Sequence, residues 1–428
     1  MKRPSISLED WRARVVEPVL LGSLFFTLIH AWILTFYYQV PYNLRIGWIP
    51  IDGPASWGDR YSFGVHFFSD YTYTHIFSLE KAPWSEIGNN YPPFAVLLTR
   101  IFSTSPERIG LFLFLYAGVI ASLAPIIHAT FRRPLREVFF LVGFCGIASA
   151  GLIAAFDRGN EILFIPALLY FAYYFLTCKK EITAGILLGL AISLKLYPLL
   201  LLPLLLLQRK FKVVVVAIFA FIISNVLSAL VWGNLGSLFS NLWDRVHSFG
   251  TYSTLGDPSF MSASSILANL SNALHPGGSR ITAMVVGQAM SISIFLYALI
   301  IIACVKASLA EIFLFGLISL ELIPKQSFSY TRIWTLAAVA ILLSLEKISR
   351  NGSEISGASQ TFFSLAKLKL WWVVVVLFTT PLTILFWGNS LTVLCGFLLF
   401  LYLVISKAVA NILLLRERFK RTPIKSEV

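Results

Sequence analysis

The sequence has few charged residues for its length. Only 13% of its 428 residues are Asp, Glu, Lys or Arg, whereas 57% are hydrophobic. A water-soluble domain of this composition would expose large apolar patches, so an ordinary soluble globular protein is excluded. The repeated apolar runs do not alternate as the strands of a membrane barrel would, and they predict α-helices that cross a membrane.

Cysteine and histidine are also scarce, with four and six residues. The cysteines are Cys145, Cys178, Cys304 and Cys395. All four lie in or at the ends of apolar segments, and their spacing fits neither a disulfide framework nor a zinc site. The histidines show no metal-ligand spacing either. We therefore expect no metal site and no cofactor.

The net charge of +13 raises the question of a nucleic-acid partner. The basic residues, however, occur in short clusters between apolar runs, which is the pattern of topology determinants. We therefore expect the partner to be the lipid bilayer of the plasma membrane and no nucleic acid. The cluster Lys2, Arg3, Arg12 and Arg14 precedes the first apolar run and keeps the N-terminus cytoplasmic.

Apolar runs and basic clusters together predict an all-α polytopic membrane protein with about twelve spans and both termini cytoplasmic. The predicted spans are 15–38, 109–130, 138–156, 162–176, two short helices within 182–208, then 213–232, 281–305, 312–323, 333–345, 370–387 and 391–414. The predicted units are a membrane domain at 1–345 with external loops at 39–93 and 233–262, a cytoplasmic linker at 346–369, a helix pair at 370–415 and a basic tail at 416–428. The long first loop is expected to carry short interfacial helices.

Lys195 decides how the run at 182–208 is interpreted. A single helix would place this lysine near the bilayer centre, which costs a few kcal/mol or more. It would also send the basic residues that follow the run outside. Two short helices that meet at 193–198 avoid both problems, and Pro198 favours a break there. We therefore place Lys195 at the outer boundary.

This topology gathers most of the chemically useful side chains on the extracytoplasmic side. Transfer of a sugar from a lipid phosphate to a hydroxyl needs a base, cations for the departing phosphate, and polar or aromatic surfaces for the sugar. The base is assigned to Asp70, and the phosphate cations to Lys195, Arg158 and Arg332. The candidate sugar and acceptor contacts are Tyr73, His75, Tyr91, Asp157, Asn160, Tyr197 and Tyr330.

Each of these assignments has a plainer alternative. Asp70 can simply cap the helix that begins near it. Asp157 and Arg158 can pair with each other or with Lys195, which in turn can be a lysine whose stem packs in hydrocarbon. Asp59 is a rival base, although Arg60 beside it favours an exposed salt pair.

Several motifs resemble a known family. They are Asp-Tyr-Thr-Tyr at 70–73, Tyr-Pro-Pro at 91–93, Arg-Gly-Asn at 158–160, and the small-residue run at 184–191 that leads to Lys-Leu-Tyr-Pro at 195–198. In this order the chain resembles the membrane glycosyltransferases of the GT-C class, and within them glycosyltransferase family 87, whose members use polyprenyl-phosphate sugars. The resemblance covers the first half of the chain. Around 327–332 the sequence has no histidine, unlike many members of the family.

The resemblance implies a GT-C-like fold and an inverting, metal-independent transfer of one sugar. The donor would be a polyprenyl-phosphate sugar, with mannose expected, and the acceptor a lipid-linked molecule or glycan of the cell envelope. In the family an aspartate of the first external loop acts as the base, and its position corresponds to Asp70. Glycolipid biosynthesis is the process this implies.

Two other functions remain open at this stage. A transporter or flippase of lipid-linked saccharides would also need cations and aromatic side chains, but distributed through the depth of the bundle. The sequence concentrates them on one side, with Glu321 as the main exception. A scaffold subunit of an envelope-assembly complex is the third interpretation.

Overall fold

The computed structural model describes residues 69–79, 91–103, 107–131, 133–147, 149–233, 308–322 and 329–350, together with isolated positions elsewhere. Within these ranges every regular element is a helix. Apart from isolated positions, the predicted spans at 15–38, 281–305, 370–387 and 391–414 lie outside the described residues, and so do most of both external loops and the linker. Eight of the twelve predicted spans can therefore be compared with the structure.

Among the described residues, two helical stretches are long and apolar enough to cross a membrane, judged by length and composition. They cover 109–130 in α6 (Glu107–Thr130), and 211–232 in α12 (Phe211–Ala229) with η6 (Leu230–Trp232). The predicted spans at 109–130 and 213–232 are confirmed to that extent. Both helices carry exposed apolar side chains, such as Phe112 at 66% and Phe219 at 60% exposure. Such surfaces suit hydrocarbon better than water.

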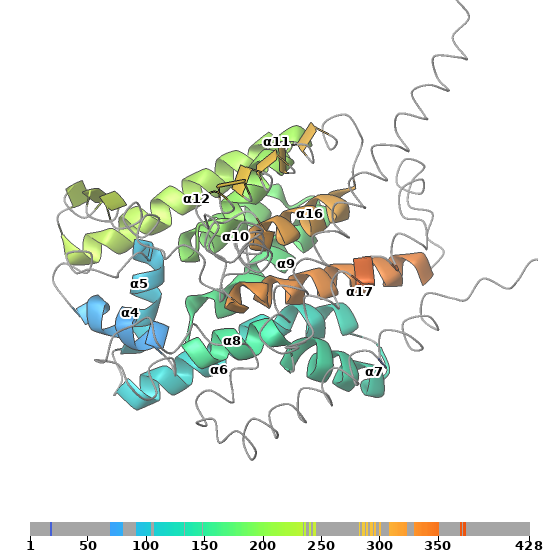
Figure 1. Ribbon diagram of the computed structural model, residues 1–428, viewed down its shortest axis with the longest axis horizontal. Coiled ribbons are helices and arrows are strands. Elements are labelled where there is room, and N and C mark those ends of the chain that lie inside the picture. The colour runs from blue at the N-terminus through green and yellow to red at the C-terminus, as the bar shows by residue number, and fades with distance from the viewer. Residues whose placement is uncertain are drawn as a thin grey trace, which may run out of the picture.

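Shorter helices fill the space between these two. The chain passes through η4 (Glu161–Phe164) into α9 (Ile165–Thr177) and returns through α10 (Glu181–Leu194), which packs against α12. Figure 1 shows α10 and α12 side by side. The contact is close because Gly185 and Gly189 of α10 face the backbone of α12. Small residues spaced four apart are the usual means by which membrane helices approach each other.

The run at 182–208 is interrupted as the sequence predicted. The helix α10 ends at Leu194, and η5 (Tyr197–Leu200) and α11 (Leu201–Leu207) follow. Between them Lys195 is extended, with φ −149° and ψ 140°. The prediction of two short helices that meet at this lysine is confirmed.

The prediction of one continuous helix over 138–156 is wrong. The segment forms α7 (Leu135–Phe140), the wider π-helical turn η3 (Leu141–Ile147) and a separate helix α8 (Ala150–Arg158). The side chain of Ser149 accepts a hydrogen bond from the backbone N–H of Leu152 and so starts α8 afresh. The new helix can then contact η7 (Ser329–Trp334) through Gly151, where any Cβ atom would collide with the η7 backbone.

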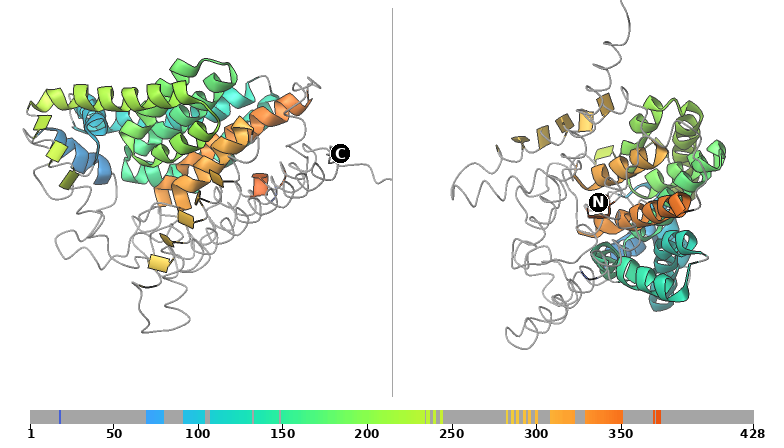
Figure 2. Two further views of the ribbon diagram at one scale, coloured as in Figure 1. Left: turned by 90° about the horizontal axis from the view of Figure 1, so that it is seen from above. Right: turned by 90° about the vertical axis from the view of Figure 1, so that its right-hand side faces the viewer.

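The helices α4 (Ser69–Leu79) and α5 (Pro93–Ser103) lie together at one end of the molecule, as all views agree (Figures 1 and 2). The helix α5 begins at the second proline of Tyr-Pro-Pro, where a missing N–H carries no penalty. The backbone N–H of Phe94 donates to Asn225 Oδ1 on α12 at 3.2 Å. A short helix is thus present at 69–79, within the predicted first external loop, and a second short helix follows that loop at 93–103.

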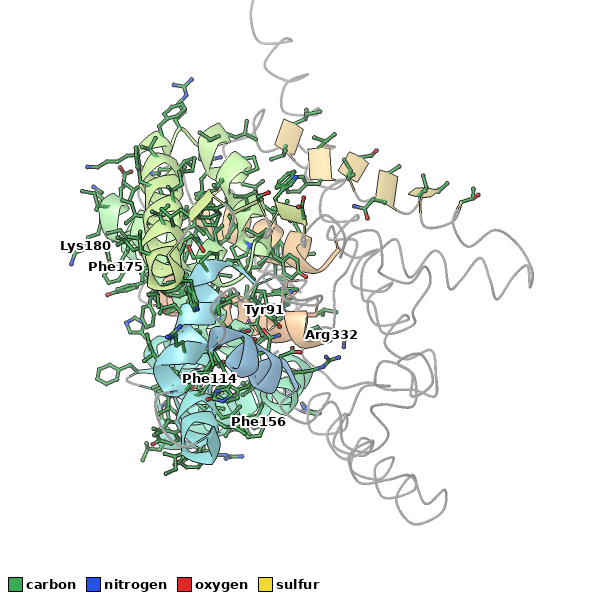
Figure 3. The ribbon with its side chains drawn as sticks, turned by 90° about the vertical axis from the view of Figure 1, so that its left-hand side faces the viewer. Tyr91, Phe114, Phe156, Phe175, Lys180 and Arg332 are labelled. Atoms are coloured by element: carbon green, nitrogen blue, oxygen red, sulfur yellow. The ribbon has the colours of Figure 1, made fainter. Side chains whose placement is uncertain are left out.

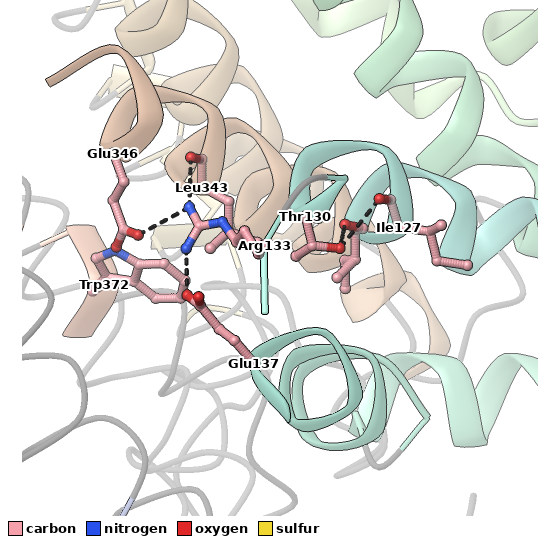
Figure 4. A network of polar contacts seen from close by, with 8 residues as sticks. Ile127, Thr130, Arg133, Glu137, Leu343, Glu346 and Trp372 are labelled. Carbon is pink, nitrogen blue, oxygen red and sulfur yellow. Dashed lines mark hydrogen bonds and ion pairs between the residues drawn. The ribbon is translucent and has the colours of Figure 1, made fainter. Parts of the chain in front are cut away.

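The remaining described helices are α16 (Leu309–Leu322) and α17 (Thr335–Arg350), and both are largely buried. The helix α17 continues to Arg350, beyond the end of the predicted span at 333–345. Glu346 is buried and accepts hydrogen bonds from Arg133 at 3.2 Å and Trp372 at 3.0 Å, as Figure 4 shows. Arg133 also pairs with Glu137, so this network ties α7 to α17.

Candidate functional site

The Arg-Gly-Asn motif forms a sharp corner between α8 and η4. Arg158 is the last residue of α8, and Gly159 follows in the left-handed conformation with φ 62°, which glycine adopts without strain. Asn160 then caps η4, because its Oδ1 accepts a hydrogen bond from the N–H of Ile162 at 2.9 Å. The corner holds both polar side chains of the motif at the same end of the molecule.

Asp70 lies against this corner. It belongs to the first turn of α4, and its carboxylate is partly buried. One oxygen, Oδ2, accepts a hydrogen bond from Asn160 Nδ2 at 2.6 Å, and the other lies 3.5 Å from Arg158 Nη1. The sequence-predicted base and two of its predicted neighbours therefore lie together, although they are about 90 residues apart in the chain.

Tyr91 and Lys195 complete the group. Asn160 Nδ2 also lies 3.3 Å from the hydroxyl oxygen of Tyr91. The Nζ atom of Lys195 stands 3.8 Å from the centre of the Tyr91 ring, within the range of a cation–π contact. Figure 3 looks onto this end of the molecule and labels Tyr91. Lys195 thus belongs to the same group of side chains as Asp70. Packing of its aliphatic stem is not its only contact.

Lys195 lies in the chain between α10 and η5 and is partly buried, with its ammonium over the Tyr91 ring. Burial lowers the pKa of this ammonium, and the charges of Glu161 and Asp70 oppose that effect by raising it, while Arg158 lowers it. The two carboxyl groups therefore stabilise the positive charge of Lys195 at a position where little water can solvate it.

Glu161 was missed by the sequence reasoning. It is the first residue of η4, directly after Asn160, and its side chain is fully buried. Its Oε1 accepts a hydrogen bond from Thr99 of α5 at 3.1 Å. Burial raises the pKa of Glu161 to about 7, with Lys195 opposing the shift. An acid in a helical first turn is common, so only its position next to Asn160 could have drawn attention to it.

Two further predicted contact residues, His75 and Tyr197, have contacts of other kinds. The Nδ1 atom of His75 is 2.6 Å from Ser103 Oγ, so this ring faces α5, and it stacks on Tyr71. Tyr197 starts η5 two residues after Lys195 and packs against the apolar core. His75 therefore lies at the α4–α5 interface, and its expected contact with the sugar stays a prediction.

Arg332 is fully buried in η7. Its backbone lies against Gly151, and its carbonyl oxygen accepts a hydrogen bond from Thr335 Oγ1 at 2.7 Å. The η7 segment also contacts η4, the element that Asn160 caps, so Arg332 comes from an element next to the Asp70 group.

For three candidates the structure describes the backbone alone. Tyr73 lies in α4, Asp157 in α8 and Tyr330 in η7, and their side chains are outside the described part. The rival base Asp59 also lies outside the described residues. The assignments at these four positions stay predictions.

The assembled group consists of one carboxylate held in place by an amide and a guanidinium, with an ammonium and a tyrosine beside it. A carboxylate so oriented can accept a proton from a hydroxyl. The two cations can hold a phosphate, Arg158 through paired hydrogen bonds and Lys195 as a point charge. The arrangement suits transfer from a phosphorylated donor to a hydroxyl.

Comparison with known proteins gives the family. The model of glycosyltransferase family 87 matches residues 89–324, more than half of the 428-residue chain. No curated protein and no solved structure matches the chain significantly. The matched range contains Tyr91, Arg158, Asn160 and Lys195 and begins after Asp70. The protein therefore belongs to glycosyltransferase family 87.

Proposed function

We propose that this glycosyltransferase moves one sugar, with mannose expected, from a polyprenyl-phosphate donor to a lipid-linked or glycan acceptor. The reaction would take place at the extracytoplasmic face of the plasma membrane. The observation that carries the proposal is the carboxylate of Asp70, held by Asn160 at 2.6 Å and Arg158 at 3.5 Å beside Lys195. Membership of family 87, a family of membrane glycosyltransferases, supports it.

In the proposed step the acceptor hydroxyl oxygen attacks the anomeric carbon of the sugar from the face opposite the phosphate. A new carbon–oxygen bond forms, and the bond to the phosphate oxygen breaks with its electron pair on that oxygen. Asp70 takes the hydroxyl proton. Attack from the opposite face inverts the anomeric configuration. The donor phosphate is already a good leaving group, so no general acid is needed.

Cations of the protein stabilise the departing phosphate in this proposal. Lys195 and Arg158 contribute two positive charges next to Asp70, and Arg332 comes from the neighbouring η7. Preorganised charges of this kind stabilise a developing anion without reorganisation of solvent. We therefore propose a transfer that needs no metal ion. We propose Tyr91, whose hydroxyl oxygen lies 3.3 Å from Asn160 Nδ2, and Tyr197 of η5 as the aromatic contacts of the sugar.

The proposal is tested with purified protein, a radiolabelled polyprenyl-phosphate mannose and a membrane-lipid acceptor fraction. The change Asp70→Asn removes the base but leaves an acceptor oxygen for the Asn160 amide. The transfer rate should fall by about 10²- to 10⁴-fold, the usual contribution of a general base. The matched change Asp59→Asn alters the rival acid by the same chemistry and should leave the rate within about twofold of wild type.

The two variants separate the assignments. Full activity of Asp70→Asn would refute the base role of Asp70, and loss of activity in Asp59→Asn alone would move that role to Asp59. No labelled product from the wild type, together with movement of the intact lipid-linked sugar between bilayer leaflets of proteoliposomes, would instead identify a transporter.

A further inference from the structure

Glu161 is a buried acid that the proposed step does not use. Its side chain has no exposure to solvent, and one oxygen, Oε1, accepts the hydrogen bond from Thr99. The other oxygen, Oε2, is buried and has no hydrogen-bond partner among the described residues. A buried carboxyl group whose second oxygen has no hydrogen-bond partner costs more free energy when it is ionised than when that oxygen carries a proton.

The charged surroundings of Glu161 are those of the proposed donor site. Lys195 and Asp70 act on its charge directly. The helices α8 and η7, which pack against η4, contribute Arg158 and Arg332 at this end of the molecule. Among the described side chains, α6 and α9 face η4 mainly with apolar groups, and Ser122 of α6 donates to the carbonyl of Leu163.

The negative charge beside Lys195 changes during the proposed reaction. The donor phosphate is a diester with one negative charge, whereas the polyprenyl phosphate left behind is a monoester with a charge between −1.5 and −2 near neutral pH. When the product leaves and the site is empty, this charge disappears from the pocket. Lys195 then has only Asp70 and Glu161 as the carboxylates that stabilise its charge among the groups described.

We propose that Glu161 takes up a proton when a lipid phosphate binds beside Lys195 and releases it when the phosphate leaves. The carboxyl group thereby keeps the charge of the pocket nearly constant. The inference rests on the proposed function, because it takes the phosphate of a polyprenyl donor or product as the ligand of Lys195. It makes Glu161 a positioning residue that acts through Lys195 and does not touch the reacting atoms.

The environment of the Glu161 carboxyl group determines how phosphate binding changes its pKa. Burial raises the pKa of Glu161 to about 7 in the empty site, so that near neutral pH both of its forms are populated. A phosphate anion bound to Lys195 disfavours a second negative charge nearby and raises this pKa further. Binding at pH 7.5 must therefore draw a proton from solution.

The test measures proton uptake when undecaprenyl phosphate is added to the purified protein in weakly buffered detergent solution. At pH 7.5 the wild type should take up about half to one proton per bound phosphate more than Glu161→Gln, which carries no titratable group at this position. The subtraction removes the titration of the phosphate itself. Glu181→Gln is the matched control, because Glu181 pairs with Lys210 at the opposite end of α10. It should behave as the wild type does.

Affinity gives the second readout. The wild type should bind undecaprenyl phosphate more weakly as pH rises above about 7, by up to about tenfold per pH unit, because ionised Glu161 competes for Lys195. Glu161→Gln should lose most of this dependence while it still binds.

Three outcomes would count against these proposals. If the wild type binds the phosphate but takes up no more protons than Glu161→Gln does, the inference is overturned and the proposed function is left intact. Absence of binding by the wild type refutes the donor site itself. If Glu161→Gln does not fold, a pH-independent affinity of the wild type between pH 6.5 and 8.5 overturns the inference without it.

Discussion

Asn160 has two separate tasks in the structure. Its Nδ2 donates to the Asp70 carboxylate at 2.6 Å, and its Oδ1 caps η4 through the N–H of Ile162. A hydrogen bond to a charged group contributes about 1.5 to 3 kcal/mol. An N-cap contributes about 1 kcal/mol. The first task serves the reaction and the second serves the fold.

Two substitutions separate these tasks. Asn160→Ser keeps an oxygen that can cap η4 but is too short to reach Asp70, and Asn160→Ala loses both contacts. Both should reduce the sugar-transfer rate by about 10- to 150-fold, the rate equivalent of the lost hydrogen bond. Only Asn160→Ala should also lose the cap, so its thermal midpoint should lie below that of Asn160→Ser. Equal activity of Asn160→Ser and wild type would contradict the role assigned to the amide.

The sequence was informative about the site where polar residues interrupt apolar runs. Arg158, Asn160 and Lys195 are conspicuous because polar groups near hydrocarbon are costly, and all three lie next to Asp70 or Tyr91. Glu161 was missed because a helical first turn often carries an acid for local reasons. His75 was included because it is near Asp70 in sequence, and its ring contacts Ser103 of α5, a contact that the sequence does not reveal.

At the scale of elements, the small-residue run at 184–191 has a packing role. It was part of the family resemblance, and the structure places its glycines against α12. A Cβ atom at Gly189 would lie 2.5 Å from the carbonyl oxygen of Ala217 and 2.6 Å from the Cβ of Ala220. The two helices would have to move apart to accommodate it.

The change Gly189→Ala should therefore destabilise the protein by about 1 to 3 kcal/mol, the usual cost of overpacking. Gly143→Ala is the matched control, because a Cβ at Gly143 would meet no atom within 4 Å. It should be neutral or stabilise by up to about 1 kcal/mol, since alanine favours helix more than glycine does. Thermal unfolding in detergent measures both. A midpoint that falls equally in the two variants would contradict the close α10–α12 contact.

One helix break was predictable from the sequence and another was not. Lys195 and Pro198 marked the break after α10, because both are unfavourable within a membrane helix. The break before α8 has no such signal, because the segment 138–147 is apolar and contains no proline. The end of α17 could not be predicted either. A glutamate such as Glu346 is expected at the surface, whereas in the structure it accepts hydrogen bonds from Arg133 and Trp372.

At the scale of the whole molecule, the proposal places the Asp70 site outside the cytoplasm and the turn between α9 and α10 inside it. Two exposed positions report on these ends. Cys178 is a free, exposed cysteine at the end of α9, and Leu196 is 41% exposed next to Lys195. In a protein whose other cysteines are alanine, Leu196→Cys should react with a membrane-impermeant maleimide in intact cells. Cys178 should react only after lysis.

The contrary pattern would reverse the proposed topology. Labelling of Cys178 in intact cells, with Leu196→Cys protected until lysis, would place the site in the cytoplasm and exclude an extracytoplasmic reaction. For a clean comparison, each thiol is introduced or kept singly, and expression and sugar transfer are measured for each variant.

The most direct test of the account is a cryo-electron microscopy map of the protein in lipid nanodiscs with polyprenyl phosphate bound. The account predicts the phosphate within hydrogen-bond reach of Lys195 and Arg158, with Asp70 facing the position that the sugar would occupy. A phosphate bound elsewhere, with Asp70 and Lys195 unoccupied by ligand, would contradict it.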